Sequence, residues 1–203
     1  DQIMFIYQDN RGVAAARNHG IRKSANDWVA FLDSDDLWTV DKLALQRRAL
    51  QSNPDYKICY TGEHWLRHGK SVNARKQRSK YNGWIYRQCL AACIVAASSV
   101  LVHKSVFDTV GLFDENLPAC EDYELWLRIA LHYPFLYLPH PCILKQLGHW
   151  PSLSQQYGLD QHRIQALSGL LNCQLTDQQA RATRKTIVQK CRIYAEGCAK
   201  HQK

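Results

Sequence analysis

Blocks of apolar and polar positions along the chain predict alternating strands and helices. Residues 28–32 form a continuous apolar run of strand length that stops at a cluster of aspartates. Such runs are typical of central strands that are buried on both faces. Residues 13–24 are rich in alanine and carry apolar side chains at helical spacing, which predicts a helix packed against the sheet. Arg17 lies on this buried stripe, where its guanidinium needs either a carboxylate of the fold or a bound anion.

The remaining elements continue the alternation and predict an α/β fold. We expect further strands at residues 3–7, 56–62 and 96–103 and between Pro134 and Pro139, and further helices at residues 40–51, 121–128, 160–171 and 177–198. The last helix carries one apolar stripe, formed by Ile187, Cys191, Tyr194 and Cys198. Because that stripe is narrow, we interpret it as a packing face and not as a membrane-lying surface.

The composition is that of a globular domain, with 203 residues, 46% of them hydrophobic and 22% charged. No apolar run approaches the roughly 20 residues that cross a bilayer, and the start lacks the features of a signal peptide. None of the eight cysteines forms a C-x-x-C pair. We therefore expect reduced, mostly buried thiols in a cytoplasmic protein.

The net charge of +8 is concentrated in one part of the sequence. Residues 64–107 contain eight lysines and arginines and no acidic residue, whereas the rest of the chain is balanced. Such a segment either is a solvated basic loop or meets an anionic partner, which would be a phosphate, a membrane surface or a nucleic acid. No recognised nucleic-acid-binding motif accompanies it, so we expect no nucleic-acid partner.

Three aspartates within four residues follow the apolar run, at Asp33, Asp35 and Asp36. An Asp-x-Asp pair at the end of a rigid strand can hold a divalent cation that bridges to a diphosphate. A cation is also the simplest way to keep three close carboxylates ionised. One aspartate could instead cap the following helix. A phosphatase of the haloacid dehalogenase type is disfavoured because Leu37 stands where such enzymes have Thr or Val.

Four motifs, in this order and spacing, resemble those of bacterial family 2 glycosyltransferases with the GT-A fold. They are Gln8-Asp9-Asn10-Arg11-Gly12-Val13-Ala14-Ala15-Ala16-Arg17-Asn18-His19-Gly20-Ile21, Phe31-Leu32-Asp33-Ser34-Asp35-Asp36-Leu37-Trp38, Gly111-Leu112-Phe113-Asp114-Glu115 and Glu121-Asp122-Tyr123-Glu124-Leu125-Trp126-Leu127-Arg128. Gly148-His149, Leu153-Ser154 and residues 162–167 are similar to the C-terminal part of one subgroup.

The resemblance implies a mixed sheet of Rossmann-like type flanked by helices. Residues 1–150 would form a truncated GT-A catalytic domain, and residues 151–203 a C-terminal helical extension packed on it. A GT-A enzyme begins with a strand, a helix and a second strand that hold the base of the nucleotide, and this chain starts after them. We therefore expect either a fragment or a shortened protein, with weak nucleotide binding or none as given.

The implied activity is transfer of a hexose from a nucleoside-diphosphate sugar, expected to be UDP-linked, with inversion and with Mg2+ or Mn2+. The acceptor would be a hydroxyl of a cell-surface glycan or of a lipid-linked glycan. Residues 67–80 would contact an anionic acceptor or the inner membrane face, which would make the protein cytoplasmic and peripheral. The alternative is a non-catalytic, truncated transferase-like module that serves binding or assembly.

The resemblance also implies roles for individual residues on the donor side. Asp33 would lie near the ribose and diphosphate together with Ser34, and Asp35 would ligate the metal. The nucleotide diphosphate would face Arg17, with Asn10 nearby. His149 would be a metal or phosphate ligand, or else a hydrogen-bonded loop residue.

On the acceptor side, the resemblance makes Asp122 the general base. It would take the proton of the acceptor hydroxyl, with Glu121 in support. Without the resemblance, both are simply acids favoured in a first helical turn. Trp38 and Trp126 would stack on a sugar or on the acceptor, although aromatic side chains in such runs are more often part of a core.

Overall fold

Six strands form one mixed sheet at the centre of the protein, for which the computed structural model describes residues 3–67, 70–72, 79–147 and 157–201. Its order is β1 (Trp28–Ala30), β5 (Val100–His103), β3 (Ile58–Arg67), β6 (Leu136–Leu147) and β2 (Asp36–Trp38), with β4 (Lys70–Ser71) paired to β3. The pair β3 and β6 is parallel, and the other pairs are antiparallel. This sheet confirms the predicted mixed α/β fold.

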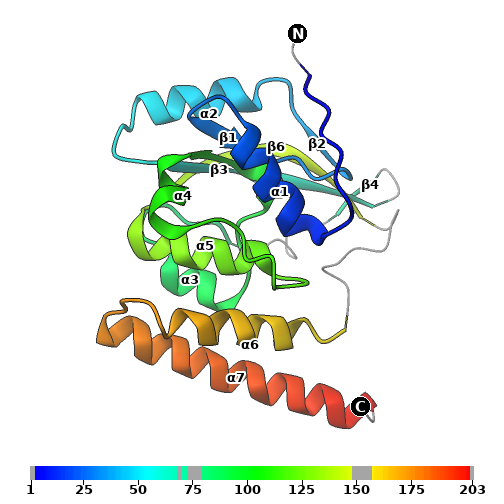
Figure 1. Cartoon of the computed structure of the whole chain (residues 1–203), viewed down its shortest axis with the longest axis vertical. Coiled ribbons are helices and arrows are strands. Elements are labelled where there is room, and N and C mark those ends of the chain that lie inside the picture. Colours follow the sequence, from blue (N-terminus) through cyan, green and yellow to red (C-terminus); the bar gives the residue numbers. More distant parts are fainter. Residues whose placement is uncertain (1–2, 68–69, 73–78, 148–156, 202–203) are drawn as a thin grey trace.

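Seven α-helices surround the sheet in the described part of the chain. They are α1 (Gly12–Lys23), α2 (Lys42–Gln51), α3 (Tyr86–Ala91), α4 (Ser105–Val110), α5 (Glu121–His132), α6 (Leu159–Leu170) and α7 (Asp177–His201), and a 3-10 turn, η2 (Ala97–Ser99), precedes β5. The α6–α7 pair lies below α3 and α5 (Figure 1). None of these helices is long and apolar enough to cross a membrane, and within the described residues all eight cysteines are outside disulfides.

The C-terminal pair is attached to the rest of the protein by specific contacts. Tyr86 of α3 and Thr183 of α7 share a buried hydrogen bond of 2.7 Å, and Ile187 packs against the main core. Cys191, from the same predicted stripe, is exposed. The stripe is therefore a packing face in part, and the division of the chain at residue 150 stays a prediction.

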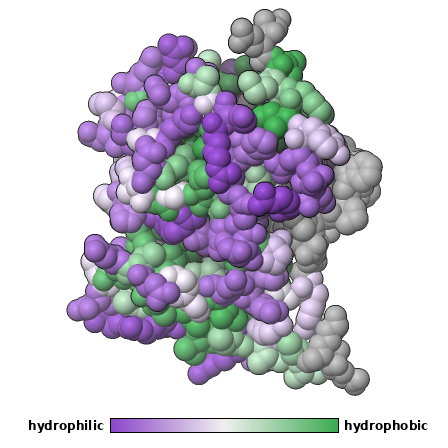
Figure 2. All heavy atoms as spheres, in the orientation of Figure 1, coloured by the Kyte–Doolittle hydropathy of each residue, from purple (hydrophilic) through white to green (hydrophobic). Residues whose placement is uncertain are grey.

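At the start of the chain one strand prediction is wrong, and a second strand is present but shorter and less buried than predicted. Residues 3–7 form no strand, and Ile3 is 95% exposed, because no neighbouring strand lies beside this segment among the described residues. Hydrophobic side chains accordingly gather on the surface close to the N-terminal end (Figure 2). The run at residues 28–32 gives only the short β1 at an edge of the sheet, where it pairs with β5 alone and leaves Trp28 37% exposed.

The strand expected between two prolines is much longer than predicted. β6 continues through Pro139 and Pro141, and its register against β3 shifts on both sides of Gly62. A proline lacks the N–H of a sheet ladder, so an irregularity is needed where it occurs. A Cβ on Gly62 would lie 3.1 Å from the backbone oxygen of His140, which explains why glycine occupies this point of close approach.

Asn18 joins α1 to the loop that precedes α5. Its amide nitrogen donates to the Phe113 oxygen at 2.9 Å, and the Phe113 N–H donates back to its Oδ1 at 3.0 Å. Asn18 is fully enclosed in this position. Buried backbone N–H and C=O groups need hydrogen-bond partners. Asn18 supplies both partners for Phe113, which lies in a loop outside the strands and helices.

Replacing Asn18 by aspartate should destabilise the protein at neutral pH. A carboxylate still accepts from the Phe113 N–H but cannot donate to the Phe113 oxygen or to Glu115, so we expect a loss of about 1–3 kcal/mol. Urea unfolding of Asn18→Asp measures it. The exposed Asn172→Asp is the matched control, with a change within about 0.5 kcal/mol. Equal stability of both variants would contradict this role.

Candidate functional site

One cleft of about 1410 Å³ collects side chains from elements that are far apart in the sequence. Its walls come from α1, β1 and the loop after it, β3, the segment before η2, the start of α5, β6 and α6. Its charged lining residues are Arg17, Asp33, Asp35, Glu63, Lys80, Glu121, Asp122, Lys145 and Arg163. The cleft thus contains nearly all of the acids that the sequence singled out.

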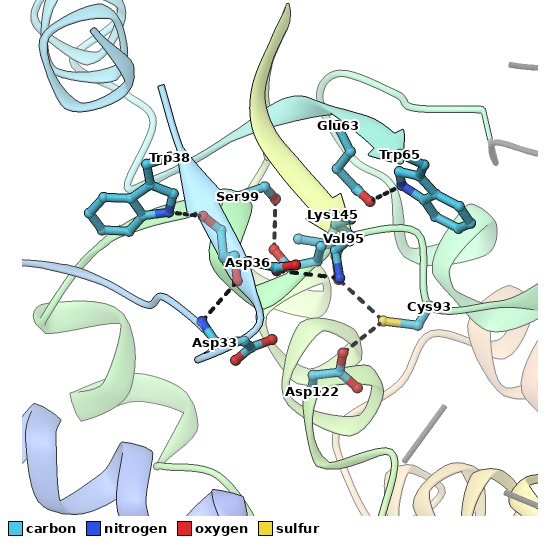
Figure 3. A network of polar contacts seen from close by, with 12 residues as sticks. Asp33, Asp36, Trp38, Glu63, Trp65, Cys93, Val95, Ser99, Asp122 and Lys145 are labelled. Carbon is cyan, nitrogen blue, oxygen red and sulfur yellow. Dashed lines mark hydrogen bonds and ion pairs between the residues drawn. The ribbon is translucent and has the colours of Figure 1, made fainter. Parts of the chain in front are cut away.

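The three clustered aspartates point to different places. The loop after β1 is tight, with the Asp36 N–H donating to the Asp33 oxygen at 3.0 Å and the Asp33 N–H donating to Ser98 Oγ at 3.1 Å. Asp33 and Asp35 line the cleft, together with Ser34. Asp36 enters β2 and is buried, 3.5 Å from Lys145 Nζ (Figure 3). Burial raises the pKa of the Asp36 carboxyl, and Lys145 opposes that rise.

Arg17 bridges two acids from distant parts of the chain. Its terminal nitrogens lie 2.6 Å from Asp33 Oδ1 and 2.6 Å from Glu121 Oε1. Burial alone would lower the pKa of Arg17, but the two carboxylates more than offset it and the pKa is raised. Of the two partners considered for Arg17, a carboxylate of the fold or a bound anion, the structure shows the first. Each terminal nitrogen already donates a hydrogen bond to a carboxylate of the fold. The predicted contact with the nucleotide diphosphate would therefore use the remaining N–H groups of the guanidinium.

The two acids that begin α5 differ in their surroundings. Glu121 is only 6% exposed, and its pKa is raised because burial and the neighbouring Asp122 outweigh Arg17. Asp122 is half-buried and lines the cleft, where Oδ1 accepts from the Tyr123 N–H at 2.6 Å. Cys120, just before them, has a left-handed φ of 65°. That conformation is uncommon for a residue with a Cβ and is frequent at functional sites.

Most cations of the cleft are already paired. Lys80 pairs with Glu63, Lys145 with Asp36, and Arg163 with Asp160. By contrast, the structure gives Asp35 no hydrogen bond or ion pair to any described residue, and it is exposed at the cleft. Among the described residues no three His, Cys, Asp or Glu side chains form a ready metal cluster. Asp35 could thus contribute one carboxylate to a divalent cation, and such an ion would need further ligands from water and substrate phosphates.

The structure brings together six of the predicted site residues, namely Arg17, Asp33, Ser34, Asp35, Glu121 and Asp122, at one cleft. Asn10 is not among the lining residues, and its Oδ1 accepts from the Gly12 N–H at 3.1 Å where α1 begins. His149 lies outside the described residues.

The two tryptophans do not line the cleft. Trp38 donates its indole N–H to the Ser98 oxygen at 2.8 Å, and Lys42 Nζ lies 4.2 Å from its ring. Trp126 is 1% exposed in the core and meets Phe113 edge to face at 6.2 Å. The interpretation of Trp126 as an acceptor contact is thus replaced by a packing role, because α5 is apolar around most of its circumference and is enclosed on most sides.

Sequence reasoning missed four residues that line the cleft: Glu63, Lys80, Cys93 and Arg163. Glu63 and Lys80 form a buried ion pair, and Trp65 also donates to Glu63 at 2.9 Å. Lys80 belongs to the basic segment that was expected to face an anionic surface. Glu63 is the only acidic residue of β3. The position of Lys80 beside it could not be inferred before the strand register was known.

Comparison of the sequence with known proteins identifies relatives of this chain. The family model described as glycosyltransferase like family 2 matches residues 2–168. An uncharacterized glycosyltransferase of Rickettsia conorii, RC0461, is 31% identical over 129 residues, which are 64% of this chain and 21% of that protein. Escherichia coli WfgD, a UDP-Glc:α-D-GlcNAc-diphosphoundecaprenol β-1,3-glucosyltransferase, is 27% identical over 119 residues, 59% of this chain and 44% of WfgD. The chain thus spans less than half of each of these relatives.

Two solved structures share the fold. Staphylococcus aureus TarS 1–349 in complex with UDP-GlcNAc superposes with a TM-score of 0.66 at 13% identity, over 95% of this chain and 54% of that one. The mannosyltransferase PcManGT of Pyrobaculum calidifontis, in complex with GDP-Man and Mn2+, gives 0.60 at 17% identity, over 93% and 56%. At these identities the likeness supports the GT-A architecture alone.

Removing the Arg17 guanidinium should leave two acids without their cation. We expect Arg17→Met to lose about 3–5 kcal/mol of unfolding free energy at pH 7, as for a broken buried ion pair. The deficit should shrink toward pH 5. Without Arg17 the pKa of Glu121 rises further, the folded state then binds more protons than the unfolded state, and stability falls as pH rises.

Urea unfolding at both pH values measures this effect. Arg22→Met is the matched control, because Arg22 is exposed and lies 3.8 Å from Glu115. It should cost no more than about 1 kcal/mol. A pH-independent deficit for Arg17→Met would show that the arginine does not control Glu121.

Proposed function

The chain belongs to the glycosyltransferase-like family 2, and from that premise we propose that it transfers a hexose from a UDP-linked sugar to an acceptor hydroxyl. The acceptor is a cell-surface glycan or a lipid-linked glycan, the configuration inverts, and Mg2+ or Mn2+ is required. The observation that carries the proposal is that Asp35 and Asp122 line one cleft and form no ion pair within the described residues.

The donor side of the cleft is organised around Arg17. Its pairs with Asp33 and Glu121 fix the loop after β1 relative to the start of α5. This leaves Asp35 as the exposed carboxylate of the loop, with Ser34 beside it. A divalent cation held there would neutralise the charge that develops on the departing nucleoside diphosphate. The bound nucleotide sugars named for TarS and PcManGT support a nucleoside-diphosphate donor.

The acceptor side is organised around Asp122. Its carboxylate takes the proton of the acceptor hydroxyl as the oxygen attacks the anomeric carbon, and a single displacement on the face opposite the leaving group inverts the configuration. Asp122 lies in the first turn of α5 and lines the cleft, which supports access of an acceptor hydroxyl to its carboxylate. Glu121 supports the step indirectly, since it holds Arg17.

Arg163 supports an acceptor that carries a phosphate. Asp160 lies 2.9 Å from Arg163 and 3.1 Å from Lys190, so two cations share one carboxylate and one positive charge is left over. Arg163 Nε is buried and has no hydrogen-bond partner among the described residues. The guanidinium interacts electrostatically with Cys120 and Tyr123, which flank the α5 acids. WfgD, by its name, uses a diphosphate-linked lipid acceptor.

The proposal includes a cytoplasmic location with peripheral contact to an anionic membrane through residues 67–80. Arg67 and Lys70 are exposed beside each other on β3 and β4. Lys80, however, points into the cleft and pairs with Glu63, so it belongs to the cleft and not to such a surface. Residues 73–78, with three further cations, lie outside the described residues.

The two acids should fail in different ways when each is replaced by its amide. Asp35→Asn should lose Mn2+-dependent binding of UDP, because its carboxylate is the proposed metal ligand. Asp122→Asn should bind normally but lose at least about 100-fold in UDP release from UDP-sugars, as expected for a missing general base. Thermal shift with UDP and Mn2+, and a UDP-release assay over a panel of UDP-sugars, measure the two effects.

Asp108→Asn is the matched control, because Asp108 is exposed on α4 and is not among the cleft residues. It should match the wild-type protein in both assays. A wild-type protein with neither a UDP and Mn2+ shift nor UDP release would contradict the proposed transfer and favour a non-catalytic binding module.

Charge reversal on the exposed basic strands tests the membrane contact. The double variant Arg67→Glu and Lys70→Glu should sediment with phosphatidylglycerol vesicles at least about 5-fold less than wild type, since each cation near an anionic surface contributes about 1 kcal/mol. The double variant Arg47→Glu and Arg48→Glu, on the exposed part of α2, carries the same charge change and should bind as wild type does. Equal losses in both variants would indicate a non-specific charge effect.

A further inference from the structure

Cys93 lies in the cleft beside the proposed base and has no part in the function argued so far. It belongs to the segment between α3 and η2, and its side chain lines the same cleft as Asp122. Its Sγ is 3.3 Å from Asp122 Oδ2 and 3.2 Å from the Val95 oxygen (Figure 3). A thiol has one hydrogen, so at any moment the full S–H bond goes to one of these two oxygens.

We propose that Cys93 is a positioning residue for Asp122, an inference that rests on the proposed transfer reaction. The Tyr123 N–H holds Oδ1 of the carboxylate at 2.6 Å, and the Cys93 thiol holds Oδ2 at 3.3 Å. When the thiol donates to Oδ2 and not to the Val95 oxygen, the two donors together fix the rotation of the carboxylate about its Cβ–Cγ bond. The other lone pairs of Oδ2 stay available for the proton of an acceptor hydroxyl.

Hydrogen bonding and burial support the backbone around this contact, which favours the positioning. The Tyr123 hydroxyl donates to the Leu90 oxygen at 2.7 Å and so ties the start of α5 to the end of α3. Ile94 and Val95, next to Cys93, are buried in the core. Cys93 and Asp122 therefore lie next to two helix ends that a hydrogen bond joins, and a reacting group needs neighbours that hold it in one orientation.

A thiol suits this task because it is a weak, neutral donor. Charged donors form much stronger hydrogen bonds to carboxylates, as Arg17 does to Glu121 next to Asp122. A carboxylate bound in that way is stabilised as the anion and becomes a poorer proton acceptor. Of the other charged or titratable groups near Asp122, Glu121 and Cys120 belong to the same helix start, and Arg17 reaches it from α1.

Alkylation with iodoacetamide tests the contact without any need for activity. The thiol proton goes to solvent, the sulfur forms a bond to carbon and iodide leaves. A carboxylate next to the sulfur disfavours the reactive thiolate. We therefore expect Asp122→Asn to speed alkylation of Cys93 about 5- to 10-fold, measured by mass spectrometry relative to Cys191 in the same molecule. Cys191 is exposed on α7 and serves as the internal reference.

Turnover tests the consequence of the contact. In the UDP-release assay, Cys93→Ala should lower kcat about 10-fold and leave the KM for the donor unchanged, whereas Cys93→Ser, which keeps a donor, should stay within about 2-fold of wild type. Cys191→Ala should not differ from wild type. Melting temperatures of the three variants exclude unfolding as the cause.

The two possible failures are distinguishable. An unchanged ratio of Cys93 to Cys191 alkylation in Asp122→Asn, or full kcat in Cys93→Ala, would overturn the positioning role while the transferase proposal stood. Loss of kcat in both Cys93→Ala and Cys93→Ser, with a lowered melting temperature, would also overturn it and assign Cys93 to packing. A wild-type protein that releases no UDP would instead contradict the transferase proposal itself.

Discussion

The bridge from Arg17 to Asp33 and Glu121 is the interaction on which the cleft depends. A guanidinium between two carboxylates joins α1, the loop after β1 and the first turn of α5, three elements that share no strand pairing with one another. Burying these charges costs free energy, and only their mutual pairing offsets that cost. The bridge is therefore better understood as a device that fixes geometry than as a source of stability.

Asn18, the next residue along α1, complements this bridge. Its amide holds the backbone of Phe113, and the Phe113 ring lies beneath the Arg17 guanidinium, 5.3 Å from its carbon. Two consecutive residues of one helix thus position both the loop before α5 and the acids that begin α5. The joint occurrence of the α1 motif and the Gly111 to Glu115 motif therefore has a physical basis, because Asn18 of the first motif satisfies polar groups of the second.

The sequence predicted the features that depend on the local pattern of residues. It did not predict those that depend on how distant segments pack together. The acids after β1 and the helix around Arg17 followed from the local pattern, and the cost of burying a charge required a partner for Arg17, either a carboxylate of the fold or a bound anion. The edge position of β1 did not, because an apolar run reads the same whether or not a second strand lies beside it. Likewise Glu63, Cys93 and Arg163 come from separate elements, and only tertiary packing brings them to one cleft.

The aspartate cluster changes meaning once the fold is known. From the sequence, a bound cation seemed the simplest way to keep three close carboxylates ionised. The fold instead gives Asp33 to Arg17 and Asp36 to Lys145, so repulsion is relieved for two of the three without any metal. Asp35 is left exposed in the cleft and without a described partner. The ion pairs of Asp33 and Asp36 thus occupy two of the three carboxylates and leave the Asp35 carboxylate available for a ligand. This arrangement is more specific than a simple excess of negative charge.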